Sequence, residues 1–203
     1  MLTKLKQKIQ QILTAEATAA HKIGLTPNTV SAIGIILAFL SAATYAMWQS
    51  RPAYLLLSTL LLLASGFCDA LDGVIARVYQ QTTIFGGFLD SLLDRYADAA
   101  VYVGIIVGGL CDTLWGLIAL TGSLLVSYCR ARAEAAGIKM ETIGLAERAE
   151  RILVIAIATL IAYFWQPTTV INAGIILLAI LTNLTVAQRS IYAYKKLKKK
   201  ETN

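Results

Sequence analysis

Six long apolar stretches constrain the fold of this chain more than any other feature of its sequence. Each holds roughly 20 mostly hydrophobic residues, the length that an α-helix needs to cross the core of a bilayer. Hydrophobic residues make up 57% of the 203 positions and charged residues only 15%, a balance that excludes an ordinary soluble domain. The sequence predicts an all-α integral membrane protein with six transmembrane helices, at residues 28–48, 53–78, 84–109, 114–136, 150–165 and 168–194.

The segments at the two ends of the chain are short and rich in lysine. Residues 1–22 carry apolar and lysine positions at helical spacing, which predicts an amphipathic helix on the membrane surface. Residues 195–203 form a basic tail with five lysines. We therefore expect one membrane-embedded domain over residues 1–203, with the six-helix core at 28–194.

The distribution of charge predicts how the chain is oriented in the cell membrane. Six spans place both termini on one side, where most lysines collect, while the other side has only Arg51. Because basic segments stay in the cytoplasm, both termini are expected there, as is the opening of the active site. The net charge of +6 is thus that of a multi-pass membrane protein, and no basic face interleaved with aromatic residues suggests nucleic acid.

Four aspartates lie inside the second and third apolar stretches, where each charge costs roughly 2.5 to 3.5 kcal/mol on insertion scales. Asp69 and Asp72 are three residues apart, and Asp90 and Asp94 are four apart, so each pair occupies one face of its helix. Both pairs lie at a similar depth from the connection that joins the two helices. Clustered carboxylate oxygens bind hard cations, so the sequence predicts a site for Mg²⁺ or Mn²⁺.

Glycines and an arginine accompany the four aspartates. Gly73 lies one turn after Asp69, and Gly86 lies one turn before Asp90, which leaves room for a ligand or for a closely packed helix. Arg77 is a suitable partner for a phosphate. Together these residues indicate a site for a phosphate ester at the level of the lipid headgroups. The competing hypothesis is a divalent cation transporter that uses the same carboxylates as its ion site.

This order of residues resembles the signature of the CDP-alcohol phosphatidyltransferase family at every position: Asp69, Asp72, Gly73, Ala76, Arg77, Gly86, Asp90 and Asp94. The resemblance implies a metal-dependent transfer of a phosphatidyl-type group from a CDP-linked lipid to an alcohol, with release of CMP. By position, it implies that Asp69, Asp72 and Asp90 bind metal, with two ions expected, and that Asp94 is the catalytic base and a further metal ligand. The positions implied for the CDP-lipid site are Gly73, Ala76, Arg77 and Gly86. A homodimer is also implied.

Five arginines in the second half of the chain are candidates for binding an acceptor that carries a phosphate: Arg130, Arg132, Arg148, Arg151 and Arg189. The alternative is that they are cytoplasmic anchors paired with Glu134, Glu147 and Glu150. The stretches S-Y-C-R-A-R-A-E and A-E-R-A-E-R are similar to those of the inositol-phosphate branch of the family. That similarity implies inositol 1-phosphate as the acceptor, with glycerol 3-phosphate as the alternative.

Two further polar residues lie near these sites in the sequence. Asn28 follows Pro27 at the start of the first span, where it could contact the nucleotide or serve only as a helix-start residue. Asp98 continues the helix face of Asp90 and Asp94 but lies outside the signature. We expect Asp98 to have a pairing role and not a catalytic one.

Overall fold

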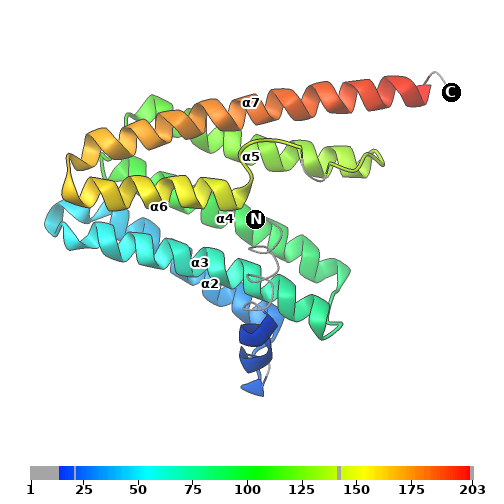
Figure 1. Cartoon of the computed structure of the whole chain (residues 1–203), viewed down its shortest axis with the longest axis horizontal. Helices are drawn as coiled ribbons and strands as arrows, with labels where there is room; N and C mark the ends of the chain where they lie inside the picture. The colour runs from blue at the N-terminus through cyan, green and yellow to red at the C-terminus, as the bar shows by residue number, and fades with distance from the viewer. Residues whose placement is uncertain (1–13, 21, 141–142, 202–203) are drawn as a thin grey trace, which may run out of the picture.

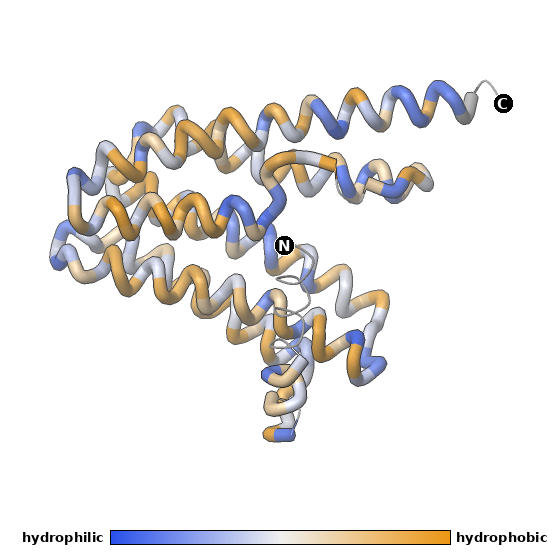
Figure 2. The backbone as a smooth tube through the Cα atoms, viewed as in Figure 1, coloured by the Kyte–Doolittle hydropathy of each residue, from blue (hydrophilic) through white to orange (hydrophobic). Residues whose placement is uncertain are grey.

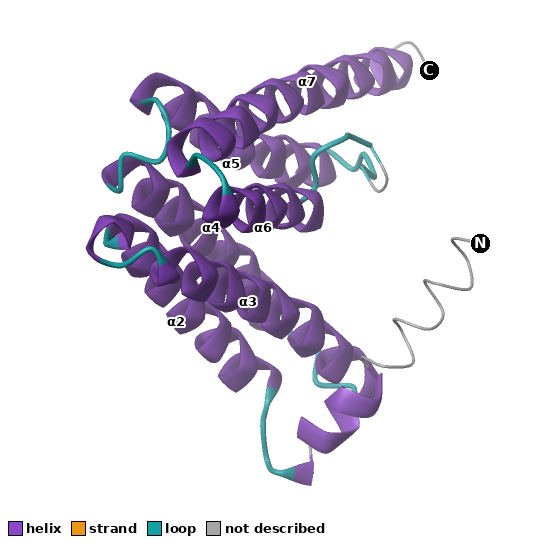
Figure 3. Cartoon of the chain, turned by 60° about the vertical axis from the view of Figure 1, so that its left-hand side comes forward, coloured by secondary structure: helices purple, strands orange, loops and turns teal. Residues whose placement is uncertain are grey.

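The computed structural model describes residues 14–20, 22–140 and 143–201, and the secondary structure of this part of the chain is helical throughout (Figure 3). Six long α-helices follow one another, with one short 3₁₀ helix, η1, after the first: α2 (Pro27–Ala46), η1 (Trp48–Ser50), α3 (Ala53–Val78), α4 (Ile84–Val107), α5 (Thr113–Ala135), α6 (Arg148–Phe164) and α7 (Pro167–Glu201). A further helical segment at 14–20 precedes them, while most of the predicted amphipathic helix, residues 1–13 and 21, lies outside the described residues.

The six long helices coincide with the six predicted stretches, and α3 has the predicted bounds. The largest difference is at the end of α7, which continues through the lysine-rich segment to Glu201. Lysine is a good helix former, and no glycine or proline interrupts this segment, so the helix has no local reason to end at Tyr194. The predicted tail is therefore mostly an extension of α7.

Four of the helices are long and apolar enough to cross a membrane: α2, α3, α5 and α7. Helix α4 carries four charged residues, Asp90, Asp94, Arg95 and Asp98, and α6 has only 17 residues. The structure thus gives an all-helical membrane protein with four candidate spans.

The helices run back and forth between two ends of the molecule (Figure 1). The connections α2–α3, α4–α5 and α6–α7 lie at one end, and the connections α3–α4 and α5–α6 lie toward the other, as does the chain's C-terminus. Helix α2 packs against α3 and α4, α5 packs against α4 and α7, and α6 packs against α3 and α7. Apolar residues dominate the middle of the helices, while the last turns of α7 are hydrophilic (Figure 2).

Small residues and hydroxyl groups hold the helices close together, as is common in membrane proteins. Helix α4 approaches α2 so closely at Gly104 that a Cβ there would overlap the backbone of Ala42. Between α2 and α3, the Ser41 hydroxyl donates to the carbonyl of Ser58, and the Ser65 hydroxyl donates to the carbonyl of Gly34, each at 2.8 Å. These contacts fix α2 against α3 and α4, the two helices that carry the aspartates.

Candidate active site

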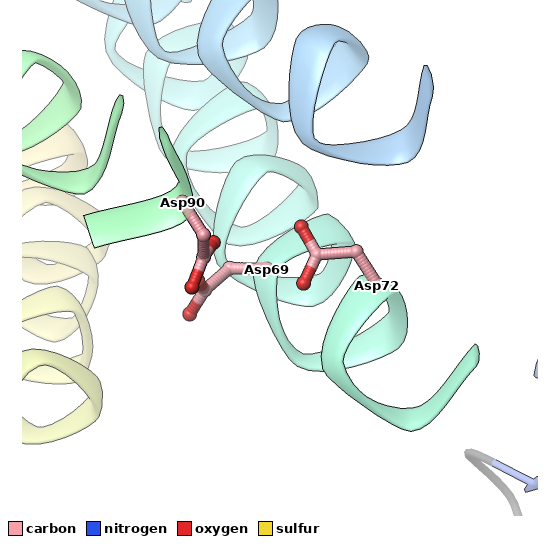
Figure 4. A group of neighbouring side chains, drawn as sticks. All are labelled: Asp69, Asp72 and Asp90. Atoms are coloured by element: carbon pink, nitrogen blue, oxygen red, sulfur yellow. The ribbon is translucent and has the colours of Figure 1, made fainter. Parts of the chain in front are cut away.

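Three carboxylates from two helices meet near the α3–α4 end of the molecule (Figure 4). Asp69 and Asp72 come from α3 and Asp90 from α4, and one oxygen from each lies within 4.8 Å of the other two. Ser31 on α2 donates a hydrogen bond of 2.5 Å to Asp72 Oδ2, and Asp72 is only 5% exposed. The structure therefore brings these three predicted metal-site residues together.

Asp94 lies beside this group and is linked to it by an arginine from α6. Arg148 Nη1 is 2.6 Å from Asp94 Oδ1 and 2.6 Å from Asp69 Oδ2. All four aspartates and Arg148 line one small cavity. Arg148 was predicted to belong to the acceptor site, and the structure places it between that site and the carboxylates.

The carboxylate group fits a divalent metal ion. Oxygens bonded to one hard cation at roughly 2.0 to 2.6 Å lie no more than about 5 Å apart, which matches the spacing of the three carboxylates. In the described part of the chain, the cavity that holds the four aspartates is lined by one cationic side chain, Arg148. Such an excess of negative charge among apolar helices is relieved by protonation or by a bound cation, and oxygen ligands favour Mg²⁺ or Mn²⁺.

A pocket of about 210 Å³, here called the glycine pocket, adjoins the carboxylates on the α2 side. It contains all five residues that were predicted for the CDP-lipid site, namely Asn28, Gly73, Ala76, Arg77 and Gly86. Asp72 and Asp90 also line it. The structure thus brings this predicted set together, next to two of the metal-site aspartates.

The two signature glycines line this pocket and do not serve close helix packing. A Cβ on Gly73 would have as its nearest neighbour Arg77 Nη1, at 3.2 Å, from the same helix. A Cβ on Gly86 would come within 2.8 Å of Thr83 Oγ1, the side chain that caps α4 by accepting from the Gly86 amide. The absence of side chains here lets Arg77 fold back along α3 and leaves the start of α4 open.

A larger cleft of about 470 Å³, here called the arginine cleft, lies on the other side of the carboxylates. Asp69, Asp90 and Asp94 line it together with four of the five predicted acceptor residues, namely Arg130, Arg148, Arg151 and Arg189. Arg132 does not line it, because it is two positions from Arg130 on α5 and turns to the exposed surface. The arginine cleft therefore adjoins three of the four aspartates, and Asp72 is the one that does not line it.

Arg151 and Arg189 are each only 3% exposed, although they carry full charges. Arg189 donates to the carbonyls of Val126, at 2.6 Å, and Ile143, at 2.8 Å. Arg151 donates to the carbonyl of Ala146 at 2.9 Å, and its Nε is buried without a hydrogen-bond partner among the described residues. Cytoplasmic anchors reach outward to water, which these two buried arginines do not, although Arg189 makes one of the glutamate pairs of the anchor interpretation, at 3.8 Å from Glu147. The anchor interpretation does describe Arg130, half-exposed in an ion pair with Glu134.

Sequence reasoning missed two residues of the site. Ser31 contacts Asp72 from another helix 41 positions away, and no local pattern marks it. Arg95 lines the arginine cleft, and its Nη2 is 3.4 Å from Asp94 Oδ2. Its position directly after Asp94, in an apolar helix, was a signal that could have identified it.

The fold and the site define a helical membrane protein with a divalent-cation site between two polar pockets. A family model described as CDP-alcohol phosphatidyltransferase matches residues 24–187, and the chain belongs to this family. It is therefore a metal-dependent phosphotransferase of CDP-linked alcohols, as the signature predicted.

Two similar relatives are archaetidylinositol phosphate synthases of archaea. The chain is 44% identical over 179 residues to archaetidylinositol phosphate synthase of Methanothermobacter thermautotrophicus, covering 88% of each chain. It is 39% identical over 197 residues to the enzyme of the same name from Pyrococcus horikoshii, covering 97% of this chain and 98% of the relative.

Solved structures of a related enzyme share the fold. The crystal structure of phosphatidylinositol phosphate synthase from Mycobacterium tuberculosis with CDP-DAG bound superposes with a TM-score of 0.76 and 29% sequence identity, covering 91% of this chain and 94% of that one. A second structure of that enzyme, in complex with manganese and citrate, also has a TM-score of 0.76 and 29% identity, covering 90% of this chain and 88% of that one.

Proposed function

We propose that this enzyme transfers a phosphatidyl-type group from a CDP-linked lipid to inositol 1-phosphate and releases CMP. The observation that carries the proposal is the arginine cleft, where the buried Arg151 and Arg189 share one space with Asp94. The named relatives support the same acceptor, because the two described above are archaetidylinositol phosphate synthases. The lipid tails are either diacyl or archaeal ether chains.

The residues divide the reaction between the two pockets. Asn28, Gly73, Ala76, Arg77 and Gly86 would bind the CDP-lipid in the glycine pocket. Asp69, Asp72 and Asp90 would hold the metal ions, two being proposed, which neutralise charge on the diphosphate oxygens when bound. Asp94 would accept the proton from the attacking hydroxyl as that oxygen bonds to the lipid-linked phosphorus and the bond to CMP breaks.

A phosphorylated acceptor explains why arginines are buried in the cleft. The two buried arginines have one carboxylate partner each, Asp98 for Arg151 and Glu147 for Arg189, and a phosphate can accept several further hydrogen bonds from such guanidinium groups at once. The buried Nε of Arg151 has no hydrogen-bond partner among the described residues and is available to donate to such a phosphate. Arg130, Arg148, Arg151 and Arg189 would therefore hold the acceptor's phosphate, and Arg132 is the least supported member of the predicted set.

We further propose that α4 and α6 also cross the membrane, giving six spans in one domain. Their charged residues lie at positions 90–98 of α4 and 148–151 of α6. Large apolar side chains are exposed further along both helices: Val103, Val107, Leu153, Ile157, Leu160, Ile161 and Phe164. Both termini and the opening of the active site would then be cytoplasmic. A homodimer, as the family resemblance implies, would bury part of this apolar surface.

The proposal is tested by measuring CMP release from CDP-lipid by the purified enzyme with inositol 1-phosphate and with glycerol 3-phosphate. We expect release that requires Mg²⁺ or Mn²⁺, strongly favours inositol 1-phosphate, and is abolished by Asp94→Asn. A strong preference for glycerol 3-phosphate would overturn the acceptor but not the family. If the protein moved Mg²⁺ across vesicle membranes and released no CMP with either acceptor, the cation transporter would be favoured instead.

A further inference from the structure

Asp98 is a buried carboxylate that the proposed reaction does not use. It lies one turn after Asp94 on α4, and its side chain is 8% exposed. Both of its ion pairs in the described part of the chain are with arginines of the cleft. Asp98 Oδ2 is 2.5 Å from Arg151 Nη2, and Asp98 Oδ1 is 3.4 Å from Arg148 Nε.

Asp98 is therefore the centre of a row of alternating charges between α4 and α6. Arg151 is held on one side of it and Arg148 on the other, and Arg148 extends further to Asp94 and Asp69. The row connects the innermost arginine of the cleft to the metal-site carboxylates. Its members all face the arginine cleft or the small cavities next to it.

The two arginines depend on this carboxylate. They are three positions apart on α6, on the same face of the helix, and have side-chain exposures of only 15% for Arg148 and 3% for Arg151. Two like charges so close together and so buried repel each other unless a carboxylate compensates them. Arg148 has other carboxylate partners, but Arg151 has no other ion pair among the described residues. Its remaining hydrogen bond is to the carbonyl of Ala146.

We propose that Asp98 is a positioning residue for the acceptor site. Its carboxylate holds Arg148 and Arg151 in one fixed arrangement, so that the phosphate of the acceptor meets a preformed cationic surface beside Asp94. Preorganised groups lose little freedom on binding, which is why such a surface binds its ligand more tightly than mobile arginines would. This inference rests on the proposed function, because it assigns a role within the acceptor site.

A purely structural role for Asp98 makes a different prediction. If Asp98 only held α4 against α6, its loss would lower thermal stability and would affect both substrates alike. A positioning role instead predicts different effects on the two KM values. The residues proposed for the CDP-lipid lie in the glycine pocket, and Asp98, Arg148 and Arg151 do not line that pocket. The KM for the acceptor is therefore the informative measurement.

The experiment compares Asp98→Asn and Asp98→Glu with the wild-type enzyme in the CMP-release assay. We expect Asp98→Asn to raise the KM for inositol 1-phosphate by about 10-fold or more and to change the KM for CDP-lipid by less than about 3-fold. Asp98→Glu keeps the charge but displaces it, and should give an intermediate KM for inositol 1-phosphate. Equal changes in the two KM values, or no change in either, would overturn the inference.

A second substitution tests whether Asp98 acts through Arg151. In a double-mutant cycle with Arg151→Lys, the combined rise in the KM for inositol 1-phosphate should be smaller than the product of the two separate rises, because both changes disturb one ion pair. A combined effect equal to the product would contradict action through Arg151.

Controls separate this inference from the proposed function. Asp112→Asn is the matched control, because Asp112 caps α5 at the opposite end of the helices and asparagine caps a helix equally well. This variant should keep wild-type KM values.

If Asp98→Asn does not fold, a folded Asp98→Glu enzyme with wild-type KM for inositol 1-phosphate overturns the inference. If the wild-type enzyme shows no activity with inositol 1-phosphate, the proposed function fails. Equilibrium binding of that compound then tests Asp98, and equal binding by wild type and Asp98→Asn would refute its role.

Discussion

Ser31 illustrates how a residue outside the acidic signature shapes the metal site. It lies on α2, and its hydroxyl donates a hydrogen bond to Oδ2 of Asp72. Asp72 itself is almost completely buried. A hydrogen bond of this kind orients a metal-binding carboxylate and leaves its other oxygen for the ion. The precision of the site therefore depends on α2 as well as on the two helices that supply the carboxylates.

We predict that Ser31→Ala will weaken metal binding without removing activity. Partners of metal ligands typically contribute 10-fold to 100-fold in metal affinity, so the Mn²⁺ concentration for half-maximal CMP release should rise by about 10-fold. Ser41→Ala is a suitable control, since Ser41 is a buried serine on the same helix that bonds to the Ser58 carbonyl and not to an aspartate. The same metal dependence in wild type and Ser31→Ala would contradict a supporting role for Ser31.

Individual residues also show where sequence reasoning ends. Helical spacing was enough to place Asp69, Asp72 and Asp90 together, because two pairs on two adjacent helices meet at one depth whenever their faces turn toward each other. Spacing could not predict that Arg148 would join Asp94 to Asp69, since that contact depends on the rotation of α6 about its own axis. The exposed position of Arg132 could not be predicted either, because a cluster of arginines in the sequence does not show which side chains turn inward.

At the scale of helices, the sequence predicted the elements well and their ends less well. Bilayer-length apolar stretches and polar connections predicted all six helices, because these signals are local. The C-terminal extension of α7 was missed, since its lysines suggested a solvated tail while their helix propensity favours continuation. The order of packing, with α2 against both α3 and α4, depends on small residues such as Gly104, whose contacts no single stretch shows.

The contact between α2 and α4 gives a prediction for helix packing. A Cβ at Gly104 would overlap the carbonyl oxygen of Ala42, which is backbone and cannot move without separating the two helices. Gly104→Ala should therefore destabilise the protein by about 1 to 3 kcal/mol, seen as a lower melting temperature in detergent. It should also lower activity, because α2 positions Ser31.

Gly66→Ala is the matched control for this change. A Cβ at Gly66 would be 3.1 Å from the terminal Cδ1 of Ile152, the flexible end of a side chain that can shift at little cost. Its melting temperature should stay near that of the wild type. If Gly104→Ala were as stable as Gly66→Ala, the close packing of α2 on α4 would not be a determinant of stability.

At the scale of the whole molecule, the site is built partly on the two long helices that are not among the four candidate spans. Asp90 and Asp94 come from α4, and Arg148 and Arg151 come from α6, the two helices that composition and length leave outside the candidate spans. At 1.5 Å per residue, α4 is about 36 Å long and α6 about 25 Å, close to the roughly 30 Å of a bilayer core. The charged residues that exclude α4 on composition line the carboxylate cavity, the arginine cleft or the small cavity next to them, and so face the interior of the protein.

Six spans predict a definite pattern of accessibility for single cysteines introduced into a cysteine-free variant. Gln81→Cys and Lys139→Cys precede α4 and α6, and Thr113→Cys and Thr168→Cys follow them, all at exposed positions. A membrane-impermeant maleimide should label the first two only from the cytoplasmic side and the last two only from the outside, because basic connections stay in the cytoplasm. Labelling of positions 81 and 113 from the same side would show that α4 does not cross, and the same result for 139 and 168 would exclude α6.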